Sequence, residues 1–183
     1  MPRYDVPKAA PEPLRLVQLF VNTADHEHGR EWLGSRAELR AWLGDQLPVK
    51  VGRPKPGDLA RAIELREALR SLLRGNNGFA TSPPAIAVIN RAAHAAKLSI
   101  QVTPAGQVTL EPRAAGVEGA LGRILAVALE AMLDGSWVRL KACRQCRWSY
   151  YDYSRNRSAR WCSMSICGNR SKTRAYRRRK ARA

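Results

Sequence analysis

The chain has 183 residues, of which 45% are hydrophobic, enough for one globular domain of average size and a small appended module. No apolar run approaches the roughly 20 residues of a membrane-spanning helix, and the N-terminus lacks the apolar stretch of a secretory signal peptide. These features argue against a membrane protein and predict a cytoplasmic location, where reduced cysteines favour a metal site over disulfides. The net charge of +17 is uneven, because residues 139–183 hold 15 Lys and Arg against a single acid, Asp152. This concentration points to a polyanionic partner.

The N-terminal part predicts a mostly helical α+β domain. Residues 1–13 are rich in proline and charge and predict a disordered leader. Residues 14–23 are apolar but too short for periodicity to distinguish a helix from a strand. Farther on, Ser35 and Glu38 form a capping-box pattern, which predicts a helix that ends near Gln46.

The next elements are predicted from helix-capping residues, prolines and the alternation of apolar and polar residues. After a proline-rich loop, Asp58 can cap a helix that runs to about Arg74 with one apolar stripe. Two alternating segments around Pro104-Ala105-Gly106 predict a β-hairpin. The remaining expected elements are a helix at 83–96, hairpin strands at 98–103 and 107–111, and a strongly apolar helix at 115–134.

All four cysteines lie in one short window, with the spacing C-x2-C-x15-C-x4-C. Two close pairs separated by a medium loop are typical of a tetrahedral zinc site. Because the window contains no histidine, we expect a closed, structural site that holds one Zn²⁺, rather than a catalytic one. The stretches 138–142 and 147–153 predict a hairpin around the first pair, and a helix is expected over about 163–181. The predicted metal ligands are Cys143, Cys146, Cys162 and Cys167.

The cysteine window also carries a family signature. Cys167-Gly168-Asn169-Arg170, with the preceding segments 154–158 and 160–164, resembles the CGNR zinc finger. Upstream, Phe20-Val21-Asn22-Thr23 and the segments 65–73 and 85–90 resemble the ABATE domain, a stress-induced transcription regulator domain of bacterial proteins. The resemblance implies a bacterial transcription regulator with a regulatory, ligand-sensing-like domain at 14–135 and the finger at 136–183.

The signature residues suggest individual roles. Gly168 is expected to let the chain pass close to the metal, and Asn169 to form hydrogen bonds around the thiolates. Arg170, Arg174, Arg177 and Arg178 are spaced to share one face of a helix, and a phosphate backbone would neutralise their mutual repulsion. Thiolate neutralisation and a solvated tail remain alternative roles for the basic residues. The predicted nucleic-acid contacts are Arg155, Arg157, Arg160, Arg170, Lys172, Arg174, Arg177 and Arg178.

The sequence thus favours DNA binding, with RNA or an acidic protein as alternative partners. Exposed aromatic side chains would favour single-stranded RNA, whereas a bare arginine-rich helix would favour duplex DNA. Asn22 and Thr23 are expected to cap a helix or to line a small pocket for an effector molecule. His26 and His28 are expected to be surface residues, and no catalytic constellation is present, so an enzyme is not expected. The sequence does not determine the oligomeric state.

Overall fold

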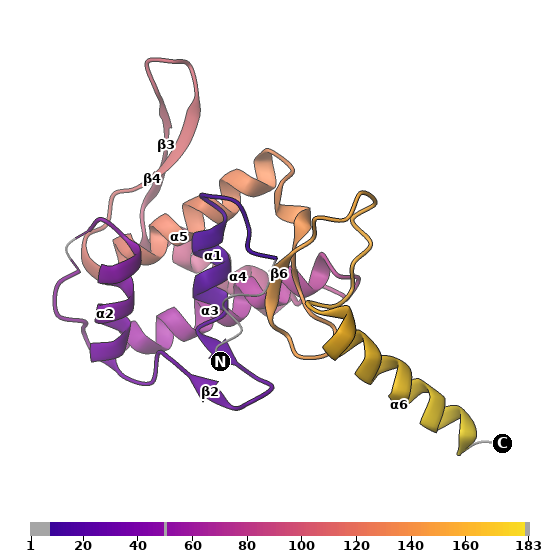
Figure 1. Ribbon diagram of the computed structural model, residues 1–183. Helices are drawn as coiled ribbons and strands as arrows, with labels where there is room; N and C mark the ends of the chain where they lie inside the picture. The colour runs from indigo at the N-terminus through magenta and orange to yellow at the C-terminus, as the bar shows by residue number, and fades with distance from the viewer. Residues whose placement is uncertain (1–7, 50, 182–183) are drawn as a thin grey trace.

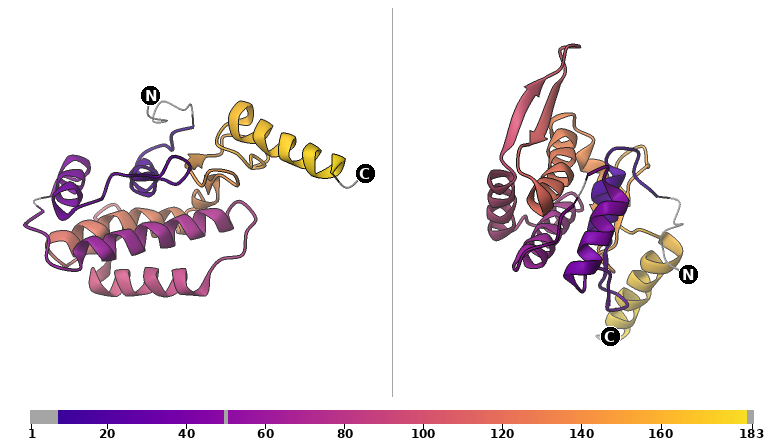
Figure 2. Two further views of the ribbon diagram at one scale, coloured as in Figure 1. Left: turned by 90° about the horizontal axis from the view of Figure 1, so that it is seen from below. Right: turned by 90° about the vertical axis from the view of Figure 1, so that its left-hand side faces the viewer.

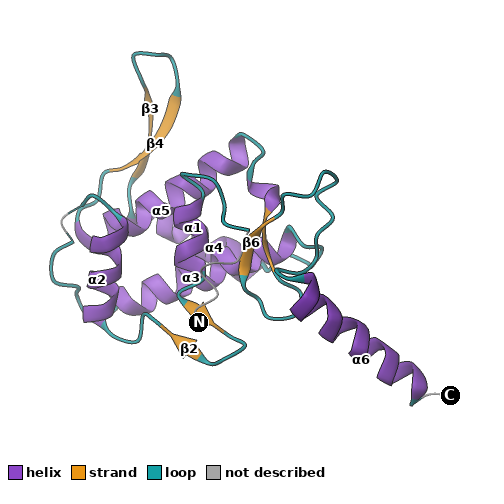
Figure 3. Ribbon diagram, viewed as in Figure 1, coloured by secondary structure: helices purple, strands orange, loops and turns teal. Residues whose placement is uncertain are grey.

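The computed structural model describes residues 8–49 and 51–181, and it has the expected α+β fold (Figure 1). Helices form the bulk of the molecule, and the strands form antiparallel hairpins (Figure 3). The helices are α1 (Arg15–Val21), α2 (Arg36–Gln46), α3 (Asp58–Gly75), α4 (Pro83–Ala95), α5 (Gly116–Leu133) and α6 (Asn169–Lys180). The hairpins are β1 (Ala24–Asp25) with β2 (Arg30–Glu31), β3 (Leu98–Val102) with β4 (Val108–Pro112), and β5 (Leu140–Ala142) with β6 (Ser149–Tyr151). A 3-10 turn (Trp137–Arg139) precedes β5, and a π-helical turn (Met164–Gly168) precedes α6.

Local hydrogen bonds determine where the helices begin, and the start of α3 differs from the prediction. The Ser35 hydroxyl accepts from the Glu38 amide at 3.2 Å, as the capping box predicts. Asp58, by contrast, lies inside the first turn of α3 and does not cap it; Gly57 occupies the cap position at φ +89°. The Asp58 carboxylate accepts from the Lys55 amide and the Arg61 guanidinium, at 2.6 and 2.5 Å. The carboxylate therefore fixes the turn that leads into α3.

The segment before α1 is packed on the protein from residue 8 onward. The Lys8 carbonyl accepts from the Tyr151 amide at 2.9 Å, and the Ala10 amide donates to the Gln18 side chain at 2.6 Å. Disorder was expected for the whole leader, and that expectation is wrong for residues 8–13. Local composition could not indicate that this segment would pair with a strand 140 residues later. Residues 1–7 of the predicted leader lie outside the described residues.

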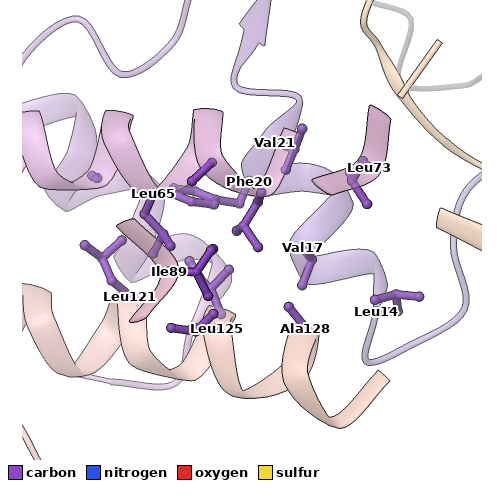
Figure 4. Packing of buried hydrophobic residues seen from close by; sticks show 14 of the residues in the cluster. Leu14, Val17, Phe20, Val21, Leu65, Leu73, Ile89, Leu121, Leu125 and Ala128 are labelled. Carbon is purple, nitrogen blue, oxygen red and sulfur yellow. The ribbon is translucent and has the colours of Figure 1, made fainter. Parts of the chain in front are cut away.

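The main core lies between α1 and the three long helices. Helices α3 and α5 form a middle layer, with α1 and α2 on one side of it and α4 on the other (Figure 2). Val17 and Phe20 of α1 point at Leu65, Ile89 and Leu125 of the long helices, and all five side chains are buried (Figure 4). Burying each such side chain stabilises the fold by about 1.5–3 kcal/mol. No helix in the described part of the chain is long and apolar enough to cross a membrane.

The C-terminal module shares this core. Trp137, Leu140, Ala142 and Tyr151 belong to the same buried cluster as the helices, although they lie beyond residue 135. A second, smaller cluster holds the four cysteines with Trp148 and Tyr150. The module is thus packed into the helical body through one side of its hairpin.

Two elements project from the body. The hairpin β3–β4 extends away from the helices, and Ile100 and Val102 in it are 70% and 69% exposed (Figure 1). Helix α6 leaves the molecule at the other end and contains no buried residue. Its contacts are mainly with the π-helical turn before it.

Candidate metal centre and basic surface

The four cysteine side chains meet at one buried point. Cys143 and Cys146 lie in the turn between β5 and β6, while Cys162 precedes the π-helical turn and Cys167 lies within it. All four are at least 96% buried, and their sulfur atoms all lie within 4.8 Å of one another. The Sγ of Cys162 is 3.5 Å from that of Cys146 and 3.7 Å from that of Cys167.

These distances fit a tetrahedral metal ion. Zinc–thiolate bonds of about 2.3 Å place neighbouring sulfur atoms about 3.8 Å apart at the corners of a tetrahedron. The observed separations are within a few tenths of an ångström of that value. Among the described residues, no other group of three or more potential ligands lies close enough together to hold an ion. His26 and His28 instead face separate carboxylates, those of Glu67 and Asp25.

The pKa values of the cysteine thiols are shifted because the four sulfur atoms lie so close together. The pKa of Cys143 is lowered because the other three thiols, Cys146 first, can donate hydrogen bonds to its thiolate. The pKa of Cys162 is raised, mainly by its hydrogen bond with Cys143. Several thiolates so close together repel one another, and a divalent cation offsets that repulsion.

Backbone hydrogen bonds shape both cysteine turns. The Cys143 carbonyl accepts from the Arg147 amide at 3.0 Å, and Arg147 adopts the left-handed conformation at φ +62°. In the second turn, the Ser163 hydroxyl accepts from the Ile166 amide at 3.3 Å, and the Ser163 carbonyl accepts from the Cys167 amide at 3.0 Å. These contacts orient both ligand pairs and set the direction in which α6 begins.

The expected roles of the two residues after Cys167 need correction. Gly168 has ordinary helical angles, φ −64° and ψ −47°, and a Cβ there would meet the Met164 sulfur at 2.5 Å rather than a cysteine. Asn169 is exposed and donates to the Ser165 carbonyl at 3.0 Å, not to a thiolate. Asn169 therefore bonds within the turn into α6, and a side chain at position 168, directly after the ligand Cys167, would crowd Met164.

The basic residues of α6 are all exposed to solvent. Arg170 forms an ion pair with Glu27 of the β1–β2 loop, and Arg174 donates to the Gln145 side chain at 3.1 Å. Within the described residues, the side chains of Lys172, Arg177 and Arg178 have no hydrogen-bond or ion-pair partner. The helix is thus held at its first two turns, and beyond them its side chains make no hydrogen bond or ion pair with the rest of the described chain.

The three loop arginines form a separate group. Arg155, Arg157 and Arg160 are exposed. The loop that carries Arg155 and Arg157 starts at the end of β6 that is opposite the cysteine turn, so this segment begins away from α6 (Figure 1). The loop then returns to the cysteine turn, where the Arg160 carbonyl accepts from the Arg144 amide at 3.2 Å. We expected this loop to lie near the start of α6. Only the part near Arg160 does so, because the hairpin β5–β6 separates the rest of the loop from the helix.

The described arginines make no hydrogen bond to the cysteine thiolates. The loop arginines and Arg170 therefore do not neutralise the thiolates through hydrogen bonds, which was one of the alternative roles considered for them. The carbonyl of Arg157 instead accepts from the Lys141 ammonium, which also pairs with the buried carboxylate of Asp152 at 2.8 Å. The loop is therefore anchored by its backbone, which leaves its guanidinium groups in solvent.

Asn22 and Thr23 bond to backbone groups at the end of α1 and in strand β6. Asn22 lies at the end of α1, where its side chain accepts from the Ser149 amide at 2.7 Å and donates to the Ser149 carbonyl at 3.0 Å. The Thr23 hydroxyl donates to the Phe20 carbonyl at 2.8 Å. Asn22 occupies the C-cap position of α1 and Thr23 bonds a carbonyl of its last turn, as expected of capping residues. Asn22 also joins the helical body to strand β6. A separate pocket of about 400 Å³ lies between α3, α4 and α5, lined in part by Val88, Ala92 and Leu121.

The sequence reading missed the buried polar residues at the junction of the two parts. Arg70 is 2% exposed, and its guanidinium donates to the Val21 and Arg147 carbonyls at 2.6 and 3.1 Å. Glu67 pairs with Arg70 at 3.0 Å. From the next loop, Asn77 donates to the Ala142 carbonyl at 2.8 Å. The available signal was the position of Arg70 beside the apolar stripe of α3, next to Leu69 and Leu73.

Comparisons with known families agree with this division of the chain. A family model described as a putative stress-induced transcription regulator, ABATE, matches residues 14–135. A second model, the CGNR zinc finger, matches residues 139–180. Both matches confirm the resemblance drawn from the sequence motifs. No curated protein matches the chain.

Proposed function

Because the chain belongs to the ABATE family and ends in a CGNR zinc finger, we propose that it is a DNA-binding transcription regulator. The proposal places it in the bacterial cytoplasm as a binding protein without a catalytic role. Its finger would present basic residues to the duplex, and its helical body would carry the regulatory function, including any response to stress or to an effector.

Zinc is the ion we assign to the cysteine cluster. Four buried thiolates without a nitrogen or oxygen ligand are typical of structural zinc, and the sulfur separations of 3.5 and 3.7 Å support that choice. Cys143, Cys146, Cys162 and Cys167 would hold one ion per chain. When bound, the ion fixes the second cysteine turn and so the point from which α6 projects.

Helix α6 is the observation that carries the proposal. Its 12 residues include seven Lys and Arg and no acid, and none of them is buried. Like charges this dense destabilise an isolated helix, and a phosphate backbone offsets the repulsion while counterions are released. An exposed helix of this kind, fixed at one end, fits the width of a DNA major groove.

The aromatic side chains support duplex DNA over single-stranded RNA. Trp148, Tyr150 and Tyr151 are buried and so cannot stack on bases. Tyr153 is 60% exposed, but its ring packs against Tyr151 and its hydroxyl donates to the Ala9 carbonyl. On α6, only Tyr176 offers an exposed ring. Elsewhere, Phe79 is 38% exposed beside the guanidinium groups of Arg74 and Arg144, and Trp161 packs partly buried against the cysteine cluster. Recognition of single strands relies on several stacked bases, so the single exposed ring of α6 favours duplex binding by this helix.

Fluorescence anisotropy tests the proposal. The zinc-loaded full chain is titrated into labelled duplex DNA, single-stranded RNA of the same sequence, and an acidic polypeptide, each over a series of salt concentrations. We expect the tightest binding to duplex DNA, with log K falling linearly as log salt rises, because phosphate contacts release counterions. Tighter binding to single-stranded RNA, or equal binding to the acidic polypeptide, would overturn the proposal in favour of the corresponding alternative.

A further inference from the structure

The basic side chains of α6 fall into two groups. Arg170 and Arg174 are each held by a residue from the body of the protein, Glu27 and Gln145 respectively. Within the described residues, the other basic side chains of the helix have no such partner. That second group consists of Lys172, Arg177, Arg178, Arg179 and Lys180. A phosphate contact needs only charge, so the orientation of just two guanidinium groups calls for another explanation.

The two oriented arginines share one surface with short polar and apolar side chains. A shallow groove along the start of α6 is lined by Ile166, Asn169, Arg170, Thr173, Arg174 and Arg177. The spacing of these residues places them on one helix face. Ile166 is 45% exposed at the head of that face, where it packs into neither core cluster. Lys172 and Arg179 line a different depression, with Tyr176.

This combination of side chains matches the edges of bases. A guanidinium can donate two parallel hydrogen bonds to guanine, an amide such as that of Asn169 pairs with adenine, and an apolar side chain contacts the thymine methyl group. A guanidinium that is already oriented loses less conformational entropy when it makes a bidentate contact. The contacts with Glu27 and Gln145 provide that orientation. A basic side chain on the other face, which has no such contact, can change its conformation to reach a phosphate.

We propose that the groove face of α6 reads base edges in the major groove, with Arg170 and Arg174 as specificity-determining residues. Lys172, Arg178 and Arg179 contact phosphates. This rests on the proposed function, because it assumes that the polymer is duplex DNA. The two arginines are one turn apart, about 6 Å along the helix axis, against about 3.4 Å per base pair. When the helix follows the groove, they contact guanines about two base-pair steps apart.

The test begins by selecting a preferred duplex from a random-sequence pool with the zinc-loaded full chain. Binding of that duplex and of a shuffled duplex is then measured by anisotropy over a series of salt concentrations, and the two duplexes are compared at the same salt concentration. We expect Arg174→Gln to weaken binding to the selected duplex by about 5- to 150-fold, the effect of one bidentate base contact. Binding to the shuffled duplex should weaken by only about 2- to 3-fold. Lys172→Gln is the matched control, expected to weaken both duplexes equally and to lower the salt slope by about one.

Glu27 provides a second variant that acts through Arg170. Glu27→Gln removes one negative charge and loosens Arg170, so we expect weaker preference for the selected duplex and tighter binding to the shuffled one. Glu111→Gln makes the same charge change on strand β4, at the other end of the molecule, and should alter neither (Figure 1). Zinc content and helical circular dichroism confirm that each variant is folded.

Three results would overturn the inference. Arg174→Gln and Lys172→Gln could weaken both duplexes alike, which would reduce Arg174 to a phosphate contact. The selection could return no preferred sequence while the protein still binds DNA, which would leave the proposed function intact. Absence of binding to any duplex would overturn the proposed function as well.

Discussion

At the scale of single residues, the junction between the helical body and the finger depends on a few buried polar side chains. Gln18, Asn22, Arg70 and Asn77 are less than 8% exposed, and each one bonds backbone groups of the finger, those of Ser149, Arg147 and Ala142 among them. Because these groups are out of reach of water, losing one partner leaves the other unsatisfied.

Asn22→Ala tests this junction. The change removes two hydrogen bonds and leaves the Ser149 amide and carbonyl without Asn22, so we expect the free energy of unfolding to fall by about 2–3 kcal/mol. Asn169→Ala is the matched control, because Asn169 is exposed and makes one local contact. Urea unfolding followed by circular dichroism measures both variants. An equal, small loss for the two would show that Asn22 does not hold the junction.

Cys162→Ser tests the metal site. Cys162 lies between two other ligands, and a serine hydroxyl is a poor replacement for a zinc-bound thiolate. We expect metal analysis of the purified protein to give one zinc per wild-type chain and a large loss of zinc in the variant. Ser158→Ala, a change at an exposed serine of the same module, should retain the zinc. A variant that keeps a full equivalent of zinc would exclude Cys162 as a ligand.

At the scale of elements, α5 is shaped by close contact with its neighbours. A Cβ at Gly122 would lie 2.5 Å from the Ala96 Cβ and 2.8 Å from the Pro112 Cβ. Gly44, in α2, has no such neighbour within 4 Å. Glycine has low helix propensity at both positions, so only packing distinguishes them.

The two glycines therefore respond in opposite directions to alanine. We expect Gly122→Ala to reduce the free energy of unfolding by about 1–3 kcal/mol through overpacking. Gly44→Ala should raise it by about 0.5–1 kcal/mol through helix propensity. Thermal or urea unfolding of the two variants measures the difference. Stabilisation by Gly122→Ala would mean that strand β4 and the end of α4 do not pack as closely on α5.

At the scale of the whole molecule, the metal site and the helical core are connected. Structural zinc contributes about 10 kcal/mol or more to the folding of isolated fingers. Leu140 and Tyr151 of the finger are buried in the main core, and exposing each costs about 2 kcal/mol. We therefore expect a chelator to lower the urea midpoint of α1 to α5 as well as to unfold the finger. Unfolding of the helices at an unchanged urea midpoint, measured by circular dichroism, would show that the two parts are independent.

The ion pairs of the half-buried Glu67 and the buried Asp152 make stability depend on pH at the acid end. Burial raises the pKa of Glu67, but the charges and hydrogen bonds of Arg70 and Arg66 together outweigh it, so that the net pKa is lowered. Burial also raises the pKa of Asp152, but the hydrogen bonds from Lys141 and Ser154 and the charge of Lys141 together lower it. Since unfolded carboxyl groups titrate near pH 4, this stabilisation is complete above that pH and is lost as pH falls through the lower folded values.

Glu67→Gln isolates one part of this dependence. The variant should be less stable than the wild type at pH 7, and the gap should narrow as the pH falls below about 4, because the wild type then loses the same charge. Urea midpoints measured between pH 3 and pH 7 give the comparison. Glu118→Gln changes a carboxylate that is about half exposed, so the stability of this variant should differ little from that of the wild type at every pH in the series. A constant gap for Glu67→Gln would contradict the lowered pKa.

The sequence by itself determined the features that depend on local spacing. The four cysteine ligands followed from two close pairs, and most helices followed from caps, prolines and apolar periodicity. The family signature was also local, since Cys167 to Arg170 are consecutive. Each of these features requires only neighbouring residues in the chain.

Only the tertiary structure decided which distant residues meet. Asn22 lies 127 residues from Ser149, and Arg70 lies 77 residues from the Arg147 carbonyl. The hairpin β5–β6 separated the start of the loop that carries Arg155 and Arg157 from α6, and the partners Glu27 and Gln145 divided the arginines of the helix into those that are held and the rest. Such contacts depend on how elements pack, and packing is set by the whole buried core rather than by any short segment.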